Sequence, residues 1–412
     1  MTNERYQSLD AMRGMAVMGI LLMNIISFSM PSDAYVNPVA YGGTTPADLG
    51  SWAAMFVLVD SKMRGLFTVL FGASMLLIYE RAQAAGEDGA AVHRKRMLWL
   101  LGFGLAHYFF IWWGDILTLY AVCGLVGMFL LLLDEAALKR TAILTIGGNF
   151  VLLAGVTLLL YGNGAEVLSP QDIEADLAIF SGSYSGIIRD RFGENLFDPV
   201  ATLLMTGLET VGLMAIGMLL LRNGFLTGDW EPERYRQTMT RAYLVGVPPS
   251  VALAAWLWAT GFDPLAMLGA FLVWSMPFRI AVTIGHAALA MLVIRRFART
   301  RLIARVEAAG KAAFTNYIGT SVLMTALFYG YGFGLYGQLS RWQTYLVVLP
   351  VWAIILLWSK PWLARFRYGP LEWAWRSLAR GKMRSRKCPI SDWLCWLPGL
   401  SSRPRHQPSS PR

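Results

Sequence analysis

Runs of apolar residues, each close to twenty residues long, recur from one end of this chain to the other. Each run is long enough to cross a hydrocarbon core of about 30 Å as an α-helix. A backbone in lipid must satisfy its own hydrogen bonds, which leaves helices and closed barrels as the spanning structures. Barrel strands alternate polar and apolar residues over about ten positions, and residues 15–26 do not alternate. The pattern therefore predicts an all-α, polytopic membrane helix bundle.

The composition supports the same class. Of 412 residues, 56% are hydrophobic and 15% are charged, whereas soluble domains carry about 25% charged residues. The net charge of +10 raises the question of nucleic acid, but the basic residues stand in short clusters between apolar runs and not on one soluble face. We expect the lipid bilayer, and not nucleic acid, to surround this chain.

Ten apolar stretches are expected to span the membrane, within a single transmembrane domain over residues 1–382. Lys and Arg gather in every second connection, at 81–96, 139–140, 222–241 and 295–311, while 31–51 and 163–199 are acidic or neutral. Because basic loops stay cytoplasmic, both termini are predicted to be cytoplasmic. Residues 383–412, rich in Arg, Ser and Pro, are predicted to form a disordered basic tail. The ten stretches lie near residues 13–31, 52–80, 97–114, 115–133, 142–162, 200–222, 242–261, 267–294, 313–336 and 343–364.

The connection over residues 163–199 is the longest of the predicted outer segments. Its apolar residues Ile173, Leu177, Ile179 and Phe180 are spaced for a short amphipathic helix that would lie on the membrane or over a cavity. A plain connector is the preferred interpretation, and a lid over a cavity is the alternative. The three cysteines are interpreted as free thiols, and no spacing of His, Cys and carboxylates suggests a metal site.

Ten spans would divide into two inverted halves, as in many transporters. Residues 65–81 and 211–226 do share a Gly followed by Met-Leu-Leu and a basic end. They belong to the second and sixth predicted spans, which no division into five and five would relate. Chance similarity is the preferred interpretation.

Ionisable side chains inside the predicted spans are candidates for function, because each costs about 2.5–3.5 kcal/mol near a bilayer centre. Asp60 and Arg64 are spaced i,i+4 and are able to pair on one helix face; alternatively they sit at the outer interface with Lys62. A membrane His often only packs between helices. The candidates are Asp60, Lys62, Arg64, His107, Asp115, Glu209, Arg279 and His286.

His107 is the preferred functional candidate among these residues. Gly102, Gly104 and Gly114 have no side chains and leave space on its predicted helix. Asp115 follows eight residues after His107, which on a continuous helix is about 12 Å. We therefore expect that the two side chains do not touch but face one cavity. The alternative for Asp115 is that it only solvates a tight outer turn.

Five motifs in order along the chain resemble the YeiB-like family of bacterial multi-spanning proteins and, more distantly, membrane acyltransferases such as heparan glucosaminide N-acetyltransferase. The resemblance covers residues 5 to about 380 and implies a multi-pass protein of the bacterial cytoplasmic (inner) membrane. The motifs are residues 8–24 (SLDAMRGMAVMGILLMN), 62–72 (KMRGLFTVLFG), 107–121 (HYFFIWWGDILTLYA), 310–317 (GKAAFTNY) and 368–376 (YGPLEWAWR).

The resemblance implies that a cytoplasmic acyl-CoA meets an acceptor in the membrane, with a His as base or transient acyl carrier. His107 is the candidate. Asn24 would orient the acceptor or polarise the thioester carbonyl, while Asp10 and Arg13 would either meet a donor phosphate or pair with each other. One difference argues against this acyltransfer mechanism. Residues 25–92 contain no His, whereas the acetyltransferases carry their catalytic His soon after the first motif.

Two functions are therefore predicted. The first is an acyltransferase with catalytic His107, Asp115 and Asn24, using acyl-CoA as co-substrate, holding no permanent cofactor, and modifying a small molecule or an envelope glycan or lipid. The alternative is a secondary transporter or exporter; a non-catalytic partner of another envelope protein is a third. A homodimer is left open. For substrate binding we name Asp10, Arg13, Asp60, Arg64, Glu209 and His286.

Overall fold

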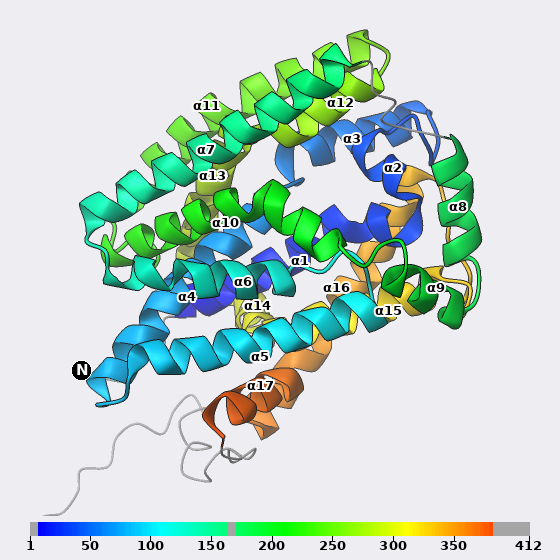
Figure 1. Cartoon of the computed structure of the whole chain (residues 1–412). Helices are drawn as coiled ribbons and strands as arrows, with labels where there is room; N and C mark the ends of the chain where they lie inside the picture. Colours follow the sequence, from blue (N-terminus) through cyan, green and yellow to red (C-terminus); the bar gives the residue numbers. More distant parts are fainter. Residues whose placement is uncertain (1–6, 164–169, 382–412) are drawn as a thin grey trace, which may run out of the picture.

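The computed structural model describes residues 7–163 and 170–381, and this part of the chain contains helices and no β-strand. The all-α prediction is confirmed. The predicted tail over residues 383–412 lies outside the described residues. The helices (Figure 1) are α1 (Gln7–Ser29), α2 (Ser32–Val36), α3 (Pro46–Leu58), α4 (Lys62–Ala84), α5 (Gly89–Phe110), α6 (Leu117–Val126), α7 (Glu135–Gly162), α8 (Pro170–Phe180), α9 (Tyr184–Phe192), α10 (Asp198–Arg222), α11 (Pro232–Ala259), α12 (Pro264–Gly269), α13 (Met276–Phe297), α14 (Arg301–Lys311), α15 (Ala313–Phe328), α16 (Arg341–Arg365) and α17 (Pro370–Arg380), with the 3₁₀ segment η1 (Gly127–Leu132) and the π segment η2 (Ala270–Trp274).

Six of these helices are long and apolar enough to cross a membrane: α1, α7, α10, α11, α13 and α16. The pieces α6 with η1, α12 with η2, and α15 are apolar but shorter, and α4 and α5 carry several charges. Helices occupy each of the ten predicted stretches. The number of crossings and the side on which the termini lie stay predictions.

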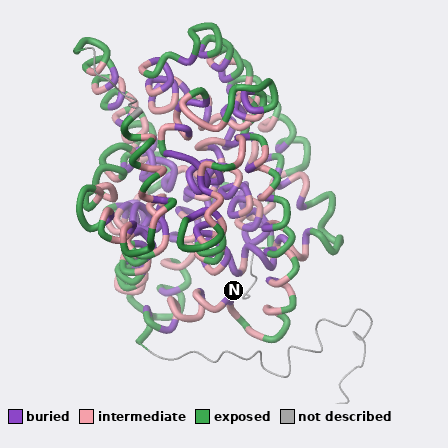
Figure 2. Tube along the Cα trace, turned by 90° about the vertical axis from the view of Figure 1, so that its right-hand side faces the viewer, coloured by how far each residue is buried: buried purple, intermediate pink, exposed green. Residues whose placement is uncertain are grey.

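Helix α1 forms the centre of the bundle, and α7, α11 and α16 form its periphery. In the most apolar part of α1, 78% of the residues are buried, against 17% in α7 and 22% in both α11 and α16. The outer helices expose large apolar side chains, such as Ile143 and Leu144 at 71% each. Figure 2 shows buried residues in the middle and exposed ones around them. A water-soluble protein rarely exposes so much apolar surface, so this surface fits lipid.

The prediction that residues 52–80 form one continuous helix is wrong. The segment is broken into α3 and α4 by a turn at residues 59–61. Ser61 has φ of 63°, a left-handed conformation that a helix interior does not allow and that is uncommon for a residue other than glycine. Asp60 lies in this turn and not on α4, so the predicted i,i+4 pair of Asp60 with Arg64 does not form.

The predicted eighth span over residues 267–294 is also interrupted. Its chain runs through α12, the π segment η2 and then α13, with Ser275 at the junction. A π segment widens the helix and leaves backbone carbonyls without their usual partners. Helix α13 packs against the start of α4, because Thr283 Oγ1 donates to the carbonyl of Lys62, which directly follows the turn at 59–61, at 3.3 Å.

Helices α4 and α10 pack closely through a reciprocal pair of glycines. A Cβ added at Gly72 would lie 2.1 Å from the carbonyl oxygen of Met214, and one at Gly217 would lie 1.9 Å from that of Val69. Both glycines belong to the two similar segments, residues 65–81 and 211–226, whose shared pattern is attributed above to chance. Small residues at such crossings allow helix backbones to approach in a membrane, so the shared pattern marks a helix–helix contact.

The amphipathic helix predicted within residues 163–199 is confirmed as α8, which is followed by α9. Phe180, at the end of α8, is buried against the rings of Tyr329 and Tyr336. The carboxylate of Asp176 accepts hydrogen bonds from the backbone N–H and the hydroxyl of Ser32, at the start of α2. The connection is thus held against the rest of the protein at the right-hand end of the bundle in Figure 1.

Candidate active site

His107 and Asp115 form a buried pair at the junction of α5 and α6. The Nδ1 atom of His107 lies 2.8 Å from Oδ1 of Asp115, and the two side chains are 0% and 2% exposed. The prediction that they do not touch is wrong, because it assumed a continuous helix. Helix α5 ends at Phe110, and the chain then turns through residues 111–116, which carries Asp115 back towards His107.

Asp115 is fixed by the start of α6. Its Oδ1 accepts a hydrogen bond from the N–H of Leu117 at 3.1 Å and its Oδ2 one from the N–H of Thr118 at 2.7 Å. These N–H groups have no partner within their own helix, so a carboxylate satisfies them well. Asp115 therefore shapes the turn, as the structural alternative proposed, and also orients His107.

The other ring nitrogen of His107 faces no partner. A carboxylate accepts hydrogen bonds, so Nδ1 of His107 donates and Nε2 of the neutral ring is left as an acceptor. Among the described residues, Nε2 is buried without a hydrogen bond, and so are Nε1 of Trp112 and Oγ1 of Thr118. Three buried polar atoms without partners around one turn are unusual in a folded protein. Such atoms are able to bind a water molecule or a polar group of a ligand.

Aromatic side chains enclose the pair. The ring of His107 lies 5.1 Å from that of Tyr317 and 6.3 Å from that of Trp112. The hydroxyl of Tyr317 accepts from the N–H of Ile116 at 3.3 Å and donates to the carbonyl of Gly114 at 3.4 Å. A narrow cavity lies beside Asp115, lined by Tyr108, Trp113, Asp115, Thr118, Leu119, Pro199 and Thr202.

Asn24 lies buried on α1, one helical turn before Phe28. Phe28 stacks on Trp112 with ring centroids 3.8 Å apart, and residues four apart lie on the same helix face. Asn24 therefore belongs to the face of α1 that is turned towards the His107 side of the bundle. No contact joins Asn24 itself to His107 or Asp115 in the described part of the chain.

A second buried cluster joins three helices through charged side chains. Glu209 on α10 accepts from Nη2 of Arg64 on α4 at 2.9 Å. Arg279 on α13 donates to the same carboxylate from Nε at 3.1 Å and from Nη2 at 3.0 Å. The three side chains are 12%, 2% and 7% exposed for Arg64, Glu209 and Arg279. We call them the Arg64–Glu209–Arg279 triad.

The triad carries one more positive charge than negative charge. In the described structure Nη1 of Arg64 is buried without a hydrogen bond, although Nη1 of Arg279 donates to the carbonyl of Phe271 in the π segment η2 at 2.9 Å. The interrupted helix α12–η2–α13 thus supplies both a charge and a carbonyl to this cluster. A surplus cation with unused N–H groups suits an anionic ligand.

The two clusters are connected through Tyr120 on α6. Its hydroxyl lies 2.9 Å from the hydroxyl of Thr68 and donates to the carbonyl of Arg64 at 3.3 Å. Tyr120 stands five residues after Asp115. The helix that begins beside the His107–Asp115 pair therefore reaches the backbone of the triad within its first two turns.

Three other candidates, His286, Asp10 and Arg13, have partners within the protein. Both ring nitrogens of His286 are occupied: Nδ1 lies 2.8 Å from the hydroxyl of Tyr243, and Nε2 lies 2.7 Å from the carbonyl of Leu58 at the end of α3. Arg13 pairs with Asp10 at 2.9 Å and donates to Ser74 of α4 at 2.6 Å. These contacts agree with the packing alternative for His286 and with the pairing of Asp10 with Arg13, and the predicted roles of all three residues in substrate binding stay predictions.

Two residues of the clusters carried no predicted role in the site. Tyr317 belongs to the motif at residues 310–317, and the sequence indicates Arg279 only as a charged residue within a predicted span. Their roles depend on partners far away in the chain, since Arg279 meets Glu209 across 70 residues. Among the described residues, no group of three His, Cys, Asp or Glu side chains is placed to hold a metal ion.

These features define a class: an α-helical protein whose apolar surface fits a membrane and whose interior holds a His–Asp pair and a charged triad. Residues 220–382 match the family described as protein of unknown function (DUF418). The chain is 32% identical over 394 residues to the uncharacterized protein YeiB of Escherichia coli (strain K12), covering 91% of this chain and 96% of that protein. It therefore belongs to this YeiB-like DUF418 family.

A second relative supports this assignment. The uncharacterized protein YxaH of Bacillus subtilis (strain 168) is 30% identical over 397 residues, which cover 92% of this chain and 94% of that protein. No solved structure matches this chain.

Proposed function

We propose that this protein is a membrane-bound acyltransferase that moves an acyl group from acyl-CoA to an acceptor hydroxyl or amine, with His107 as the general base. The observation that carries the proposal is the His107–Asp115 pair, in which Nδ1 is held by a carboxylate while Nε2 is buried without a partner. A base oriented by a third group and free at its second nitrogen is the arrangement that acyl transfer uses.

The step follows from this geometry. Nε2 of His107 takes the proton from the acceptor hydroxyl as the hydroxyl oxygen bonds to the thioester carbonyl carbon. The carbon–sulfur bond then breaks, and the imidazolium returns the proton to the departing thiolate, which leaves as the free thiol of CoA. Asp115 stabilises the imidazolium in between. The pair is fully buried in this structure, so substrate entry requires its aromatic neighbours to move.

The proposal includes a topology: ten crossings of a bacterial inner membrane, with the basic connections in the cytoplasm. Helix α5 would then start in the cytoplasm and place His107 near its outer end. The acyl donor would enter from the basic end of the bundle, at the left in Figure 1. The acceptor would be a small molecule or an envelope glycan or lipid. No permanent cofactor takes part.

The experiment uses the purified full chain with acetyl-CoA and longer acyl-CoAs. Binding is measured by calorimetry and release of free CoA thiol by a thiol reagent, in the wild type and in His107→Ala and Asp115→Asn. Loss of a general base typically lowers the rate by 10²- to 10⁴-fold, and we expect losses of about this size in both variants. His93→Gln is the matched control, because His93 is a buried residue of the same helix that contacts the carbonyl of Gly124.

Each outcome has a meaning. Thiol release in the wild type and in His93→Gln, but not in His107→Ala, supports the proposal. Undiminished release by a folded His107→Ala protein removes His107 from the mechanism. If no acyl-CoA of any chain length binds to the wild type, the acyltransferase proposal fails as a whole.

A second candidate function is transport of a small anion, which a separate observation favours. Transporters often bind substrate where membrane helices are interrupted. Here Arg279 of the triad donates to a carbonyl of η2, and Arg64 of the triad stands three residues after the turn at 59–61. The surplus positive charge of the triad would attract the anion. In proteoliposomes without acyl donor, transport predicts substrate-dependent flux that Arg64→Gln abolishes, and absence of such flux for a panel of carboxylates and phosphates would count against it.

A further inference from the structure

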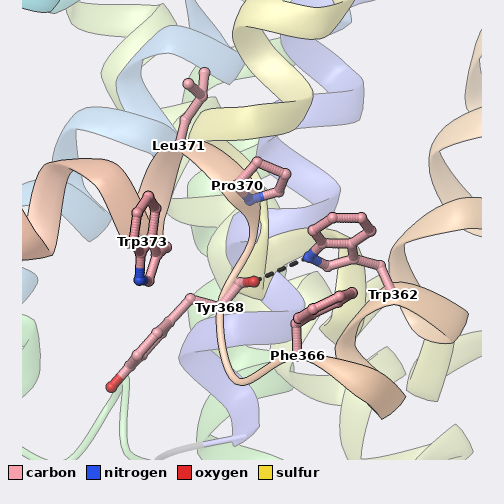
Figure 3. A pocket seen from close by; sticks show the side chains of 6 residues that line it. All are labelled: Trp362, Phe366, Tyr368, Pro370, Leu371 and Trp373. Carbon is pink, nitrogen blue, oxygen red and sulfur yellow. Dashed lines mark hydrogen bonds between the residues drawn. The ribbon is translucent and has the colours of Figure 1, made fainter. Parts of the chain in front are cut away.

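Helix α16 has different surroundings at its two ends. At its C-terminal end a cavity of about 280 Å³ opens towards α17, and Figure 3 shows that apolar and aromatic side chains line it. The indole N–H of Trp362 in this wall donates to the backbone carbonyl of Tyr368 at 3.0 Å. At the N-terminal end, by contrast, Arg341 and Tyr345 lie among polar and charged side chains of other segments. A ligand with polar groups therefore fits the N-terminal end of α16.

Arg341 holds the first turn of α16 against α2. It is 2% exposed, and its Nη2 donates to the carbonyl of Ala34 at 2.6 Å. Ala34 directly precedes Tyr35, so this hydrogen bond brings Tyr35 to the first turn of α16. The guanidinium of Arg341 also interacts with the hydroxyl of Tyr345, one turn further along α16. In the described structure Nε of Arg341 is buried without a hydrogen bond.

Tyr35 lies between this turn and the Arg64–Glu209–Arg279 triad. Its ring packs edge-on against Phe271 with the ring centroids 5.4 Å apart, and the carbonyl of Phe271 is the one that accepts from Arg279. The charges of Arg64 and Arg279 act on the hydroxyl of Tyr35. Tyr35 is half-buried, and among the described residues its hydroxyl has no hydrogen-bond partner. That hydroxyl is therefore available to a ligand beside the triad.

Asp60 adds a carboxylate to the same region. Its charge acts on the hydroxyls of Tyr35 and Tyr345, and the cations Lys62 and Arg341 lie around it. Within residues 7–163 and 170–381 this half-buried carboxylate forms no hydrogen bond and no direct ion pair, and the ammonium of Lys62 donates to a backbone carbonyl of α3 instead. Its oxygens are therefore free to accept from a ligand. We call these residues the Tyr35–Asp60–Tyr345 cluster.

The triad and this cluster together carry one more positive charge than negative charge. The triad has two basic side chains and one acidic side chain. Around the cluster, Lys62 and Arg341 are balanced by Asp60 and Asp48. A ligand with a single negative charge would neutralise the whole region. Its carboxylate would bind at Nη1 of Arg64, which is buried without a hydrogen bond in the described part of the chain.

The neighbours of Asp60 decide which other group such a ligand carries. An ammonium group at Asp60 would also face the positive charges of Lys62 and Arg341, and like charges repel each other. A hydroxyl group has no such charge. It donates to a carboxylate and accepts from a tyrosine hydroxyl, and a few converging polar groups of this kind set the specificity of small-molecule sites. The cluster therefore suits hydroxyl groups better than an amine.

We propose that the triad and the Tyr35–Asp60–Tyr345 cluster form one binding site for a small hydroxylated carboxylic acid. The carboxylate binds at Arg64, and the hydroxyl groups bind at Asp60 and Tyr35. The proposal rests on the anion site of the transport proposal, which it deepens by naming the class of anion. It requires neither acyl-CoA nor the His107–Asp115 pair.

The test measures binding to the detergent-purified full chain by calorimetry, without an acyl donor, for gluconate, hexanoate and glucose. These probes have carbon chains of equal length and supply charge with hydroxyl groups, charge alone and hydroxyl groups alone. We expect gluconate to bind about tenfold more tightly than either of the others, as one or two added hydrogen bonds give.

Variants assign the two parts of the site. Arg64→Gln should weaken gluconate and hexanoate alike. Asp60→Asn and Tyr35→Phe should each lower the ratio of gluconate affinity to hexanoate affinity by about fivefold. This ratio cancels the change in net charge that Asp60→Asn causes. Tyr161→Phe, at the exposed end of α7, is the matched control and should leave the ratio unchanged.

Several results would overturn the proposal. Equal affinities for gluconate and hexanoate would show that hydroxyl groups are not recognised, and equal affinities for gluconate and glucose would show the same for the charge. A ratio that survives both Asp60→Asn and Tyr35→Phe would place the hydroxyl groups elsewhere. Absence of binding for gluconate, glucuronate and lactate would exclude the ligand class.

Proteoliposome flux separates this proposal from the transport proposal. Binding of gluconate with the expected ratios, but without flux, supports the binding site and contradicts transport. Flux of other anions by a protein that binds no hydroxy acid supports transport and overturns the ligand class proposed for this site.

Discussion

At the scale of single residues, Glu209 is the carboxylate on which the interior depends most. It holds two guanidinium groups from two other helices, and it is 2% exposed. A buried charge that loses its partner costs about 3–5 kcal/mol, because desolvation is then not offset by attraction. The role of Glu209 in stability is thus separable from any role in function.

We therefore expect Glu209→Gln to lower the melting temperature of the detergent-purified protein by many degrees. The matched change is Glu307→Gln, which breaks the partly exposed pair with Lys311 on α14 and should cost less than about 1 kcal/mol. Thermal unfolding followed by fluorescence measures both. Equal effects of the two substitutions would show that the triad does not stabilise the fold in this way.

Asp33, in the segment between α1 and α3, makes the free energy of unfolding depend on pH. Burial, and then the nearby charges of Asp172 and Asp176, raise the pKa of Asp33 from 3.8 to about 6. A raised carboxyl pKa means that the folded state prefers the protonated form. Its contribution to stability is therefore complete below about pH 4 and is lost as the pH rises through about 6.

Replacing Asp33 by Asn should consequently raise the melting temperature at pH 7.5 and leave it unchanged at pH 4. The gain should stay within about 1 kcal/mol, because solvent screens a half-exposed group. Glu194→Gln, at an exposed acidic residue of the separate connection over residues 163–199, serves as the control. A gain that is the same at both pH values would contradict this account.

The predicted site residues differ in how far the sequence could place them. His107 and Asp115 stand in one motif, and a turn near Asp115 was predicted. Their 2.8 Å contact depends on the early end of α5 at Phe110, which the apolar run to residue 114 did not indicate. Arg64 and Glu209 are 145 residues apart in the chain. A single sequence contains no signal that pairs such positions, because any buried acid would satisfy any buried base.

At the scale of elements, helix existence follows from apolar length, while helix interruption does not. The predicted second span is apolar from residue 52 to the end of α3 at Leu58. The residue with left-handed backbone conformation in the following turn is Ser61. A glycine at that position would have predicted the break, but a serine does not. In the same way, η2 consists of apolar residues that suit an α-helix equally well. Local preference alone therefore does not predict the position of either interruption.

The reciprocal contact of α4 with α10 gives a prediction at this scale. Gly217→Ala would place a methyl group 1.9 Å from the carbonyl oxygen of Val69, so the helices must separate. Overpacking of this kind costs about 1–3 kcal/mol or more. Gly155→Ala on α7, where a methyl group meets nothing within 4 Å, should be neutral or slightly stabilising. Melting temperatures of the two variants check this, and similar values would contradict the close contact.

At the scale of the whole molecule, the alternation of basic and acidic connections predicts which side each end of the bundle faces. Single cysteines are introduced at Glu87, between α4 and α5, and at Glu174 on α8, both of which are exposed. The background carries serine at Cys388 and Cys395. In intact cells an impermeant maleimide should label Glu174→Cys and not Glu87→Cys. Labelling of both positions from outside would show that the predicted topology is wrong.

The Arg64–Glu209–Arg279 triad also has a consequence for how the protein is made. Its charges come from α4, α10 and α13, so the first arginine leaves the ribosome 145 residues before its acidic partner. Until α10 follows, Arg64 carries an insertion cost of about 2.5–3.5 kcal/mol without its acidic partner. A nascent chain that stops before α10 therefore holds Arg64 in the membrane without its acidic partner. The charge is balanced when Glu209 of α10 arrives, and Arg279 of α13 then joins a pair that is already neutral.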